Sequence, residues 1–230
     1  MKKIIFLTFL AFSSTCFCQI PDWTETTCDG TGYNMYTELG NGNAVILDFG
    51  SMWCGPCNIT APELQTIWEN YGQGSMGVKI FDFLLEDASA NQADCADLAF
   101  WEMQHSLTYP GFANANVSNI FAQYNATYGS GGIPLILMFI PNINNPGAST
   151  LVFSSSSNLS SHDQLAEVLS GILLDNSYWA LDIDEYKSNN NVELLKIVDM
   201  LGRETKLVPN TPLIYYYSDG TQRKIFKNNY

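Results

Sequence analysis

The sequence Trp53-Cys54-Gly55-Pro56-Cys57 lies between a predicted strand and a predicted helix. The strand is Ala44-Val-Ile-Leu-Asp-Phe49, a short apolar run with β-branched residues and with Asn and Gly at its ends. The helix spans residues 59–71, where apolar side chains recur at helical spacing, and Pro62 is expected to kink it near its start. Two cysteines separated by two residues therefore stand at a helix start, where they can close a small disulfide ring.

This position favours ionisation of the first sulfur. Cys54 faces the positive end of the helix dipole, and in such pairs the thiol pKa falls from ~8.5 to roughly 3.5–7.5. Thiolate is the nucleophile in disulfide exchange, and Cys57, one helical turn along, would resolve the mixed disulfide. The chemistry requires that the Cys54 sulfur be ionised near neutral pH and open to an incoming polypeptide.

Three other interpretations of the pair compete with redox chemistry. A zinc site needs two further ligands, and the sequence has no second close pair of cysteines. A purely structural disulfide of this size would restrict little chain entropy. The pair could also be an inactive remnant on a binding module. Redox chemistry is the favoured interpretation, and the inactive remnant is its main alternative.

Strands and helices alternate along the chain as far as residue 175. Further strands are predicted at 78–85, 133–140 and 150–153, the last one antiparallel to its predecessor across a turn rich in Asn, Pro and Gly. Further helices are predicted at 91–106, 117–124 and 163–174, with a polar loop at 154–161. The fold class is therefore α/β, with a central mixed sheet covered by helices on both faces.

Composition limits the possible partners. The 230 residues are 46% hydrophobic and carry a formal net charge of −13, which indicates an acidic globular protein. Nucleic acid is an unsuitable partner, because binding phosphates requires clustered Lys and Arg. No apolar run reaches the ~18–20 residues that a membrane span needs.

The first residues resemble a secretory signal. Lys2 and Lys3 precede an apolar stretch from Ile4 to Phe12, and cleavage after Cys18 would leave Gln19 as the first residue. A lipid anchor on Cys16 is a minor alternative. Export places the remaining cysteines in an oxidising environment. Residues 1–18 are thus predicted to be a signal peptide, with an extracellular or outer cell-surface location after transit through the periplasm.

The motif and its surroundings resemble the thioredoxin-like family over about residues 22–175. Asp48 stands six residues before Cys54, where that family keeps a buried carboxylate that relays protons for the second cysteine. Pro62 matches the family's helix-kinking proline. Gly132-Ile133-Pro134 resembles its cis-proline loop, whose backbone pairs with an extended client peptide.

The resemblance implies a set of site residues. Cys54, Cys57 and Asp48 are expected to be catalytic. Asp48 could instead be a strand-end cap, but a lone carboxylate in an apolar strand is costly to bury without a task, so the proton relay is favoured. The residues expected to bind the client, some of which could simply pack beside the site, are Trp53, Gly55, Pro56, Ile133 and Pro134. His105 is expected to be a surface or core residue without a catalytic role.

The chain departs from the smallest thioredoxins in a long segment, residues 88–131, before the proline loop. Such an insertion is typical of the exported, membrane-associated branch and of peroxiredoxins, but Gly50 and Ser51 replace the residues of the peroxidase signature. Cys95 lies in this insertion and Cys28 in the N-terminal arm. We hypothesise that these two form a structural disulfide that ties the arm to the insertion.

The last part of the chain, residues 177–230, differs in composition. It holds seven basic and seven acidic residues, whereas residues 19–176 hold one basic residue, Lys79, and 16 acidic ones. Strand-like runs flank Ser218-Asp219-Gly220, a strong hairpin signal, so a small β module is expected, or an extension that packs on the main domain. Leu194–Thr205, Asn210–Ile214 and Asp219–Lys224 resemble C-terminal sorting domains of type IX secretion cargo in Bacteroidetes.

Together these features predict an exported thiol–disulfide oxidoreductase that exchanges disulfides with client proteins. An unknown dithiol partner would recycle it, the tail would engage the secretion machinery, and no metal or organic cofactor is implied. The direction, reductase against oxidase or isomerase, stays open. The competing class is a non-enzymatic cell-surface binding protein on the same scaffold.

Overall fold

The structure is a computed structural model that describes residues 19–72, 77–158, 161–175, 194–199, 202–205, 212–217 and 222–226. The predicted signal peptide, residues 1–18, lies outside the described residues, as do the predicted hairpin turn at 218–220 and several segments of the proposed sorting tail. Within the described part, no helix combines the length and the hydropathy that crossing a bilayer requires.

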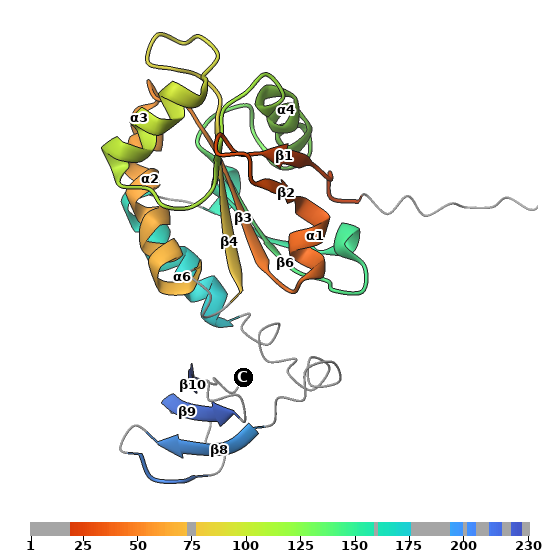
Figure 1. Cartoon of the computed structure of the whole chain (residues 1–230), viewed down its shortest axis with the longest axis vertical. Coiled ribbons are helices and arrows are strands. Elements are labelled where there is room, and N and C mark those ends of the chain that lie inside the picture. Colours follow the sequence, from red (N-terminus) through yellow and green to blue (C-terminus); the bar gives the residue numbers. More distant parts are fainter. Residues whose placement is uncertain are drawn as a thin grey trace, which may run out of the picture.

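A five-stranded mixed sheet forms the centre of residues 19–175 (Figure 1). Its order is β5-β4-β3-β6-β7, with β4 parallel to both β3 and β5, and with β6 antiparallel to both β3 and β7. The strands are β3 (Ala44–Gly50), β4 (Val78–Leu84), β5 (Gly111–Phe112), β6 (Leu135–Ile140) and β7 (Thr150–Ser154). The predicted α/β class with a central mixed sheet is confirmed.

Two layers cover the sheet (Figure 1). One contains α2 (Gly55–Ile67), α3 (Cys95–His105) and α6 (Leu165–Asp175). The other contains α1 (Met35–Gly40), α4 (Val117–Tyr128) and the short strands β1 (Thr24–Thr26) and β2 (Gly32–Asn34). This second layer leaves no strand of the sheet's centre facing water, in agreement with the continuous apolar runs in the sequence.

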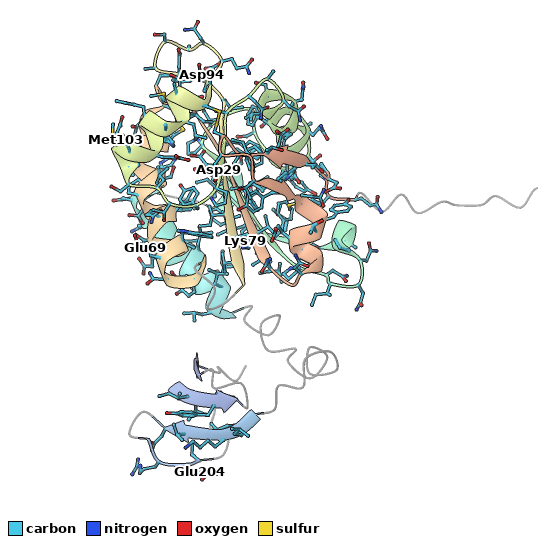
Figure 2. All side chains as sticks on the ribbon, in the orientation of Figure 1. Asp29, Glu69, Lys79, Asp94, Met103 and Glu204 are labelled. Carbon is cyan, nitrogen blue, oxygen red and sulfur yellow. A yellow bond between two sulfur atoms is a disulfide. The ribbon has the colours of Figure 1, made fainter. Side chains whose placement is uncertain are left out.

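Alternation along the strands divides the core between these layers. Ile46 packs in the cluster under α2, α3 and α6, whereas its neighbours Val45 and Leu47 pack in an aromatic-rich cluster on the opposite face. Side chains of both layers fill the space beside the sheet (Figure 2). Met103, on the outer side of α3, points away from the sheet and is 71% exposed (Figure 2).

The arm before α1 contains structure that the sequence pattern did not predict. Strands of three residues are too short to show an alternating pattern, so β1 and β2 gave no signal. Their order comes from packing instead: Trp23 is buried, with its ring edge-on to the rings of Phe81 and Phe83 at 5.1 and 5.2 Å between centroids. Strand β5 was also missed, because it has two residues.

Capping explains where two helices begin. Helix α2 begins at Gly55 rather than at residue 59, because the Cys54 sulfur accepts a hydrogen bond from the backbone N–H of Cys57 and because Pro56 is tolerated in a first turn. Helix α3 begins at Cys95 rather than at residue 91, because the Asp94 side chain caps it in a capping box.

Other elements also differ from the predicted ones: helix α4 continues to Tyr128 rather than to residue 124, and β6 begins at Leu135 rather than at residue 133. Helix α2 contains Pro62 and is followed by a π-helical segment, η1 (Trp68–Gly72). A short helix, α5 (Ser155–Asn158), lies inside the predicted polar loop. The 3₁₀ turns η2 (Pro146–Ala148) and η3 (His162–Gln164) precede β7 and α6.

The described residues near the C-terminus form a separate antiparallel sheet of order β10-β9-β8. It consists of β8 (Leu194–Asp199), β9 (Pro212–Tyr217) and β10 (Gln222–Phe226). The Arg203 guanidinium lies 2.7 Å from the Asp199 carboxylate beside the bend that follows β8. The predicted small β module is therefore confirmed, and the strand-like runs expected at 213–217 and 221–226 correspond to β9 and β10, which pair antiparallel.

Candidate functional site

A pocket of about 400 Å³ opens between the start of α2, the end of β4 and the loop before β6. Three short segments supply most of its lining. These are residues 53–56, residues 85–86 and residues 131–133, together with Ser51 and Phe121. Four of the five predicted client-binding residues line it: Trp53, Gly55, Pro56 and Ile133. The fifth, Pro134, follows Ile133 in the chain and is buried.

Cys54 is one of the residues that line this pocket, and it is the N-cap residue of α2. It is bonded to Cys57, three residues along the chain, so the structure shows the pair oxidised. Cys54 is only 4% exposed, so its sulfur is less open than the sequence analysis expected, although the residue lines the pocket. The backbone N–H of Cys57 donates to the Cys54 sulfur at 3.2 Å, and this donor would stabilise a thiolate there after reduction.

Cys57 lies inside the core, against the sheet. It is 2% exposed, and a Cβ placed on Gly50 of β3 would be 3.6 Å from its sulfur. Asp48 stands two residues before Gly50, so its side chain leaves the same face of β3, about 7 Å along the strand. The carboxyl group of Asp48 is therefore placed beside the buried sulfur rather than beside the exposed rim of the pocket.

Burial dominates the electrostatics of Asp48. The residue is 4% exposed, and its Oδ1 atom has no hydrogen-bond partner among the described residues. Loss of hydration penalises the charged form, which raises the pKa of Asp48 from 3.8 to about 7. A carboxyl group that titrates near neutral pH can either accept or supply a proton at the Cys57 sulfur.

A second buried carboxyl group, that of Asp82 on β4, was missed in the sequence. It is the register partner of Asp48, is 2% exposed, and accepts a hydrogen bond of 3.0 Å from the Trp101 indole N–H. Burial first, and then the charge of Asp48, raise the pKa of Asp82 well above its usual value. The available signal was a charged residue in the middle of the apolar run Val78–Leu85.

The loop before β6 has the predicted form. The peptide bond between Ile133 and Pro134 is cis. The Ser155 hydroxyl donates to the Pro134 carbonyl at 2.9 Å and accepts from the backbone N–H of Ile136 at 2.9 Å, which fixes the start of β6 to α5. Ile133 is thereby held at the wall of the pocket opposite the start of α2.

Glu86 is a pocket residue that the sequence analysis did not select. Its carboxylate accepts a hydrogen bond of 2.6 Å from the indole N–H of Trp53, which is 52% exposed. Its backbone carbonyl accepts from the N–H of Met52 at 3.0 Å, so the end of β4 is tied to the loop that carries Cys54. The acidic residues at the end of this strand were visible in the sequence. Their position beside the cysteine loop follows only from the parallel register of β3 and β4.

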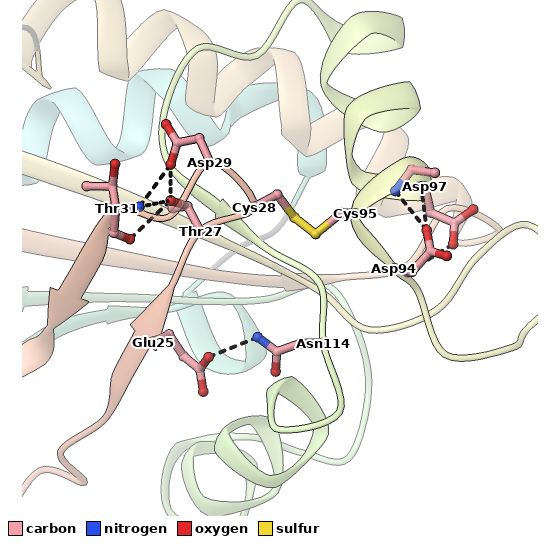
Figure 3. The surroundings of a disulfide bond; sticks show 10 residues. Glu25, Thr27, Cys28, Asp29, Thr31, Asp94, Cys95, Asp97 and Asn114 are labelled. Carbon is pink, nitrogen blue, oxygen red and sulfur yellow. Dashed lines mark hydrogen bonds between the residues drawn. A yellow bond between two sulfur atoms is a disulfide. The ribbon is translucent and has the colours of Figure 1, made fainter.

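The other two cysteines are bonded to each other on a different part of the molecule. Figure 3 shows the Cys28–Cys95 disulfide joining the arm, after β1, to the first residue of α3. A turn closed by Thr27, Asp29 and Thr31 flanks one sulfur, and the capping box of α3 flanks the other (Figure 3). Both cysteines are exposed, so this bond lies at the surface.

His105 lies away from the pocket lining, as expected. Its ring packs against that of Trp101, with 4.2 Å between centroids, and its Nε2 atom lies 3.1 Å from the Asn58 Oδ1 atom. Burial lowers the pKa of His105, which keeps the ring neutral at pH 7. Across the part of the chain that the structure describes, no group of three or more metal-ligating side chains comes together.

Comparison with known proteins identifies the segment that carries this site. Residues 30–101 match the thioredoxin family. The matched thioredoxin segment contains Asp48, Cys54 and Cys57, and it ends before the cis-proline loop.

The chain resembles solved structures, and each match extends over most of the solved chain. One is a secreted disulfide oxidoreductase of Mycobacterium tuberculosis, homologous to E. coli DsbE, with 21% identity, a TM-score of 0.46 and coverage of 65% of this chain and 95% of that one. Another is the thioredoxin domain of a thiol-disulfide oxidoreductase from Bacteroides vulgatus, with 16% identity, a TM-score of 0.49 and coverage of 67% and 94%. A third is StoA from Bacillus subtilis, with 17% identity, a TM-score of 0.45 and coverage of 64% and 95%.

Proposed function

We propose that the protein is an exported thiol–disulfide oxidoreductase that exchanges disulfides with client proteins. The observation that carries the proposal is the Cys54–Cys57 disulfide across the first turn of α2, with one cysteine in the lining of a pocket and the other beside a buried carboxyl group. A structural crosslink would not need the pocket, and a binding module would not need the buried acid.

The reaction is written here in the reducing direction. The Cys54 thiolate attacks one sulfur of a client disulfide, a Cys54–client bond forms, and the client S–S bond breaks with its electron pair on the departing sulfur, which takes up a proton. The Cys57 thiol then loses its proton to the Asp48 carboxylate and attacks the Cys54 sulfur. The Cys54–Cys57 bond forms, the Cys54–client bond breaks, and the second client sulfur leaves as a thiolate. The client gains two electrons and the enzyme loses two.

Client recognition is proposed to use the two walls of the pocket. An extended client segment would lie along Ile133, whose backbone would pair with it, with Pro134 holding the loop in place. Trp53 would cover the client from the opposite side, oriented by its hydrogen bond to Glu86. Gly55 leaves room for close approach, because no atom lies within 4 Å of a Cβ built there.

The decisive experiment is insulin disulfide reduction with dithiothreitol as electron donor. The full chain should turn over insulin, and Cys54→Ser should reduce the rate to that of dithiothreitol alone. Asp163→Asn, an exposed substitution on η3 outside the pocket, serves as the control and should retain the rate. Equal turnover by the full chain and Cys54→Ser would leave the binding-protein alternative.

Direction is a separate proposal. The Gly-Pro pair between the cysteines favours a reducing couple, near the roughly −270 mV of thioredoxin. Equilibration of the Cys54–Cys57 pair with glutathione buffers would measure the potential. A value near the about −120 mV of a strong oxidant would assign the oxidase role instead.

Export and sorting are proposed from the two ends of the sequence. Residues 1–18 would direct export, and the tail that includes β8, β9 and β10 would engage type IX secretion machinery, with release or attachment at the cell surface. Deletion of residues 177–230 should leave the protein in the periplasm of a host with that machinery. Cell-surface labelling that is unchanged by this deletion would contradict the sorting role.

A further inference from the structure

Two carboxyl groups lie side by side beneath the cysteine pair. In the parallel pairing of β3 with β4, Asp48 stands opposite Asp82, so both side chains leave the same face of neighbouring strands about 4.8 Å apart. Their residues are 4% and 2% exposed. Both groups belong to the face that carries Cys57, because the cluster under α2 and α3 contains Cys57 together with residues two positions from each aspartate, Ile46 on β3 and Ile80 and Leu84 on β4.

Among the residues that the structure describes, their surroundings contain hydrogen-bond donors and acids but no ion-pairing Lys or Arg. The Trp101 indole donates to Asp82 Oδ2, and Tyr109 presents a buried hydroxyl group with no partner among the described residues. Glu102, on α3, raises the pKa of Asp82 by its charge. His105, behind Trp101, has a pKa lowered by burial and stays neutral at pH 7. In the described part of the chain, neither carboxyl group forms an ion pair with Lys or Arg.

Such a site cannot readily hold two negative charges. Burial penalises each charge, and a second like charge on the neighbouring strand penalises the pair further. Burial raises the pKa of Asp48 to about 7, and burial together with the charge of Asp48 raises the pKa of Asp82 well above its usual value. Asp82 is therefore the member that keeps its proton longer. Because the indole occupies Oδ2, that proton belongs on Oδ1.

We propose that Asp48 and Asp82 form a carboxyl pair that holds one proton between them at neutral pH, and that Asp82 is the positioning residue of this pair. The role in turnover rests on the proposed function. When the Cys57 S–H bond breaks, its proton goes to the Asp48 carboxylate and the pair then holds two protons. The Cys57 sulfur forms its bond to Cys54, and the client sulfur leaves with the electron pair of the broken bond. The pair returns its extra proton to that thiolate or to water.

The neutral Asp82 has a specific consequence for this step. It leaves Asp48 as the one charged member of the pair beside Cys57, so the thiol can still ionise. If Asp82 also lost its proton, a second negative charge would oppose formation of the Cys57 thiolate and slow the resolving step. The pair therefore sets an upper pH limit for resolution, and that limit belongs to Asp82.

The pair is tested without turnover, on the oxidised full chain, by carbon-13 NMR titration of aspartate side-chain carboxyl carbons. Two coupled steps are expected, the lower mainly from Asp48. Asp82→Asn, which keeps an oxygen for the indole, should remove the upper step and leave the lower one near its place. Asp48→Asn should move the Asp82 step down by about one pH unit or more. The exposed Asp29→Asn should change neither.

Two results would overturn the pair: both carboxyl groups ionised at pH 7, or an Asp82 step at the same pH in the unsubstituted chain and in Asp48→Asn. Since these spectra need no client, they are independent of whether the protein reduces insulin. The positioning role is tested by the rate of client release from the mixed disulfide as a function of pH. Asp82→Asn should lose the decline on the alkaline side, and an unchanged profile would refute the role.

Discussion

The two disulfides of the molecule differ in nearly every respect. Cys54–Cys57 closes a separation of three residues, has Cys54 in the lining of a pocket and sits beside buried acids. Cys28–Cys95 closes a separation of 67 residues, lies at the surface and joins the arm to α3. Because stabilisation by a crosslink grows with the length of the loop it closes, the long ring is suited to hold the fold. The short ring is suited to open and close.

The largest expected effect separates the two sulfurs of the short ring. Cys57→Ser should lower insulin turnover on the order of a thousandfold or more, as loss of an essential group does in other enzymes. It should also accumulate a mixed disulfide through Cys54, because no resolving sulfur remains. Cys54→Ser should lose turnover without accumulating it. Non-reducing electrophoresis with mass mapping measures the adduct, and equal adduct in both variants would reverse the roles of the two cysteines.

Stability should depend mainly on the long ring. Replacing Cys28 and Cys95 together by Ala should lower the free energy of unfolding by about 4 kcal/mol, against about 2 kcal/mol for the same replacement of Cys54 and Cys57. Urea unfolding of the oxidised proteins provides the measurement. The first variant should still reduce insulin under conditions in which it is folded. Equal losses of stability would mean that the long ring closes a loop that is already ordered in the unfolded chain.

The acid beneath the short ring should make stability depend on pH. The folded pKa of Asp48, about 7, lies above its ordinary 3.8, so folding favours the protonated form. Its contribution is fully present below pH 3.8 and is lost as pH rises through 7, by up to about 4 kcal/mol. Asp48→Asn should reduce this decline in urea titrations between pH 4 and 8, and the decline that remains should come from Asp82, whose pKa burial also raises. A decline of the same size in the variant would exclude Asp48 as its source.

Local patterns were sufficient to predict the sheet and the chemical pair. The apolar runs at 44–49, 78–85 and 133–140 are buried on both faces, where periodicity alone does not separate a strand from a buried helix, but their short length, β-branched residues and flanking turn residues favour a strand. Helix starts were less well predicted, because the Cys54 cap depends on a sulfur acceptor and the Asp94 cap overrides the pattern before it. Strands β1 and β2 carry no pattern of their own and depend on burial of Trp23.

The candidate site shows the same division. Asp48 could be selected because the resemblance to the thioredoxin-like family specifies its distance to Cys54 in the sequence, and both lie on one continuous strand and loop. Asp82 and Glu86 come from the next strand, and their place beside the site follows from the register of β3 with β4. Register is a tertiary property, so a single sequence offers only the indirect signal of a charge in an apolar run.

Helix α3 connects the two disulfide regions, and its tryptophan gives the smallest expected effect. The helix begins at Cys95, and six residues later Trp101 donates its hydrogen bond to Asp82. Trp101→Phe keeps most of the buried ring but leaves the carboxyl group without this donor, so the free energy of unfolding should fall by about 1–3 kcal/mol. Because that hydrogen bond lowers the pKa of Asp82, its loss should also move the Asp82 titration to higher pH.

Trp53→Phe is the matched control for this substitution. Its indole donates to Glu86 at the exposed rim of the pocket, where water can replace the lost partner, so stability should change by less than about 0.5 kcal/mol. Urea unfolding of both variants, with the NMR titration of Asp82, distinguishes the two tryptophans. Equal losses of stability would mean that the buried hydrogen bond of Trp101 stabilises the fold no more than the exposed one of Trp53. An unchanged Asp82 titration in Trp101→Phe would show that α3 supports the carboxyl pair by packing and not through this hydrogen bond. The helix that begins at Cys95 would then have no direct effect on the pKa of Asp82.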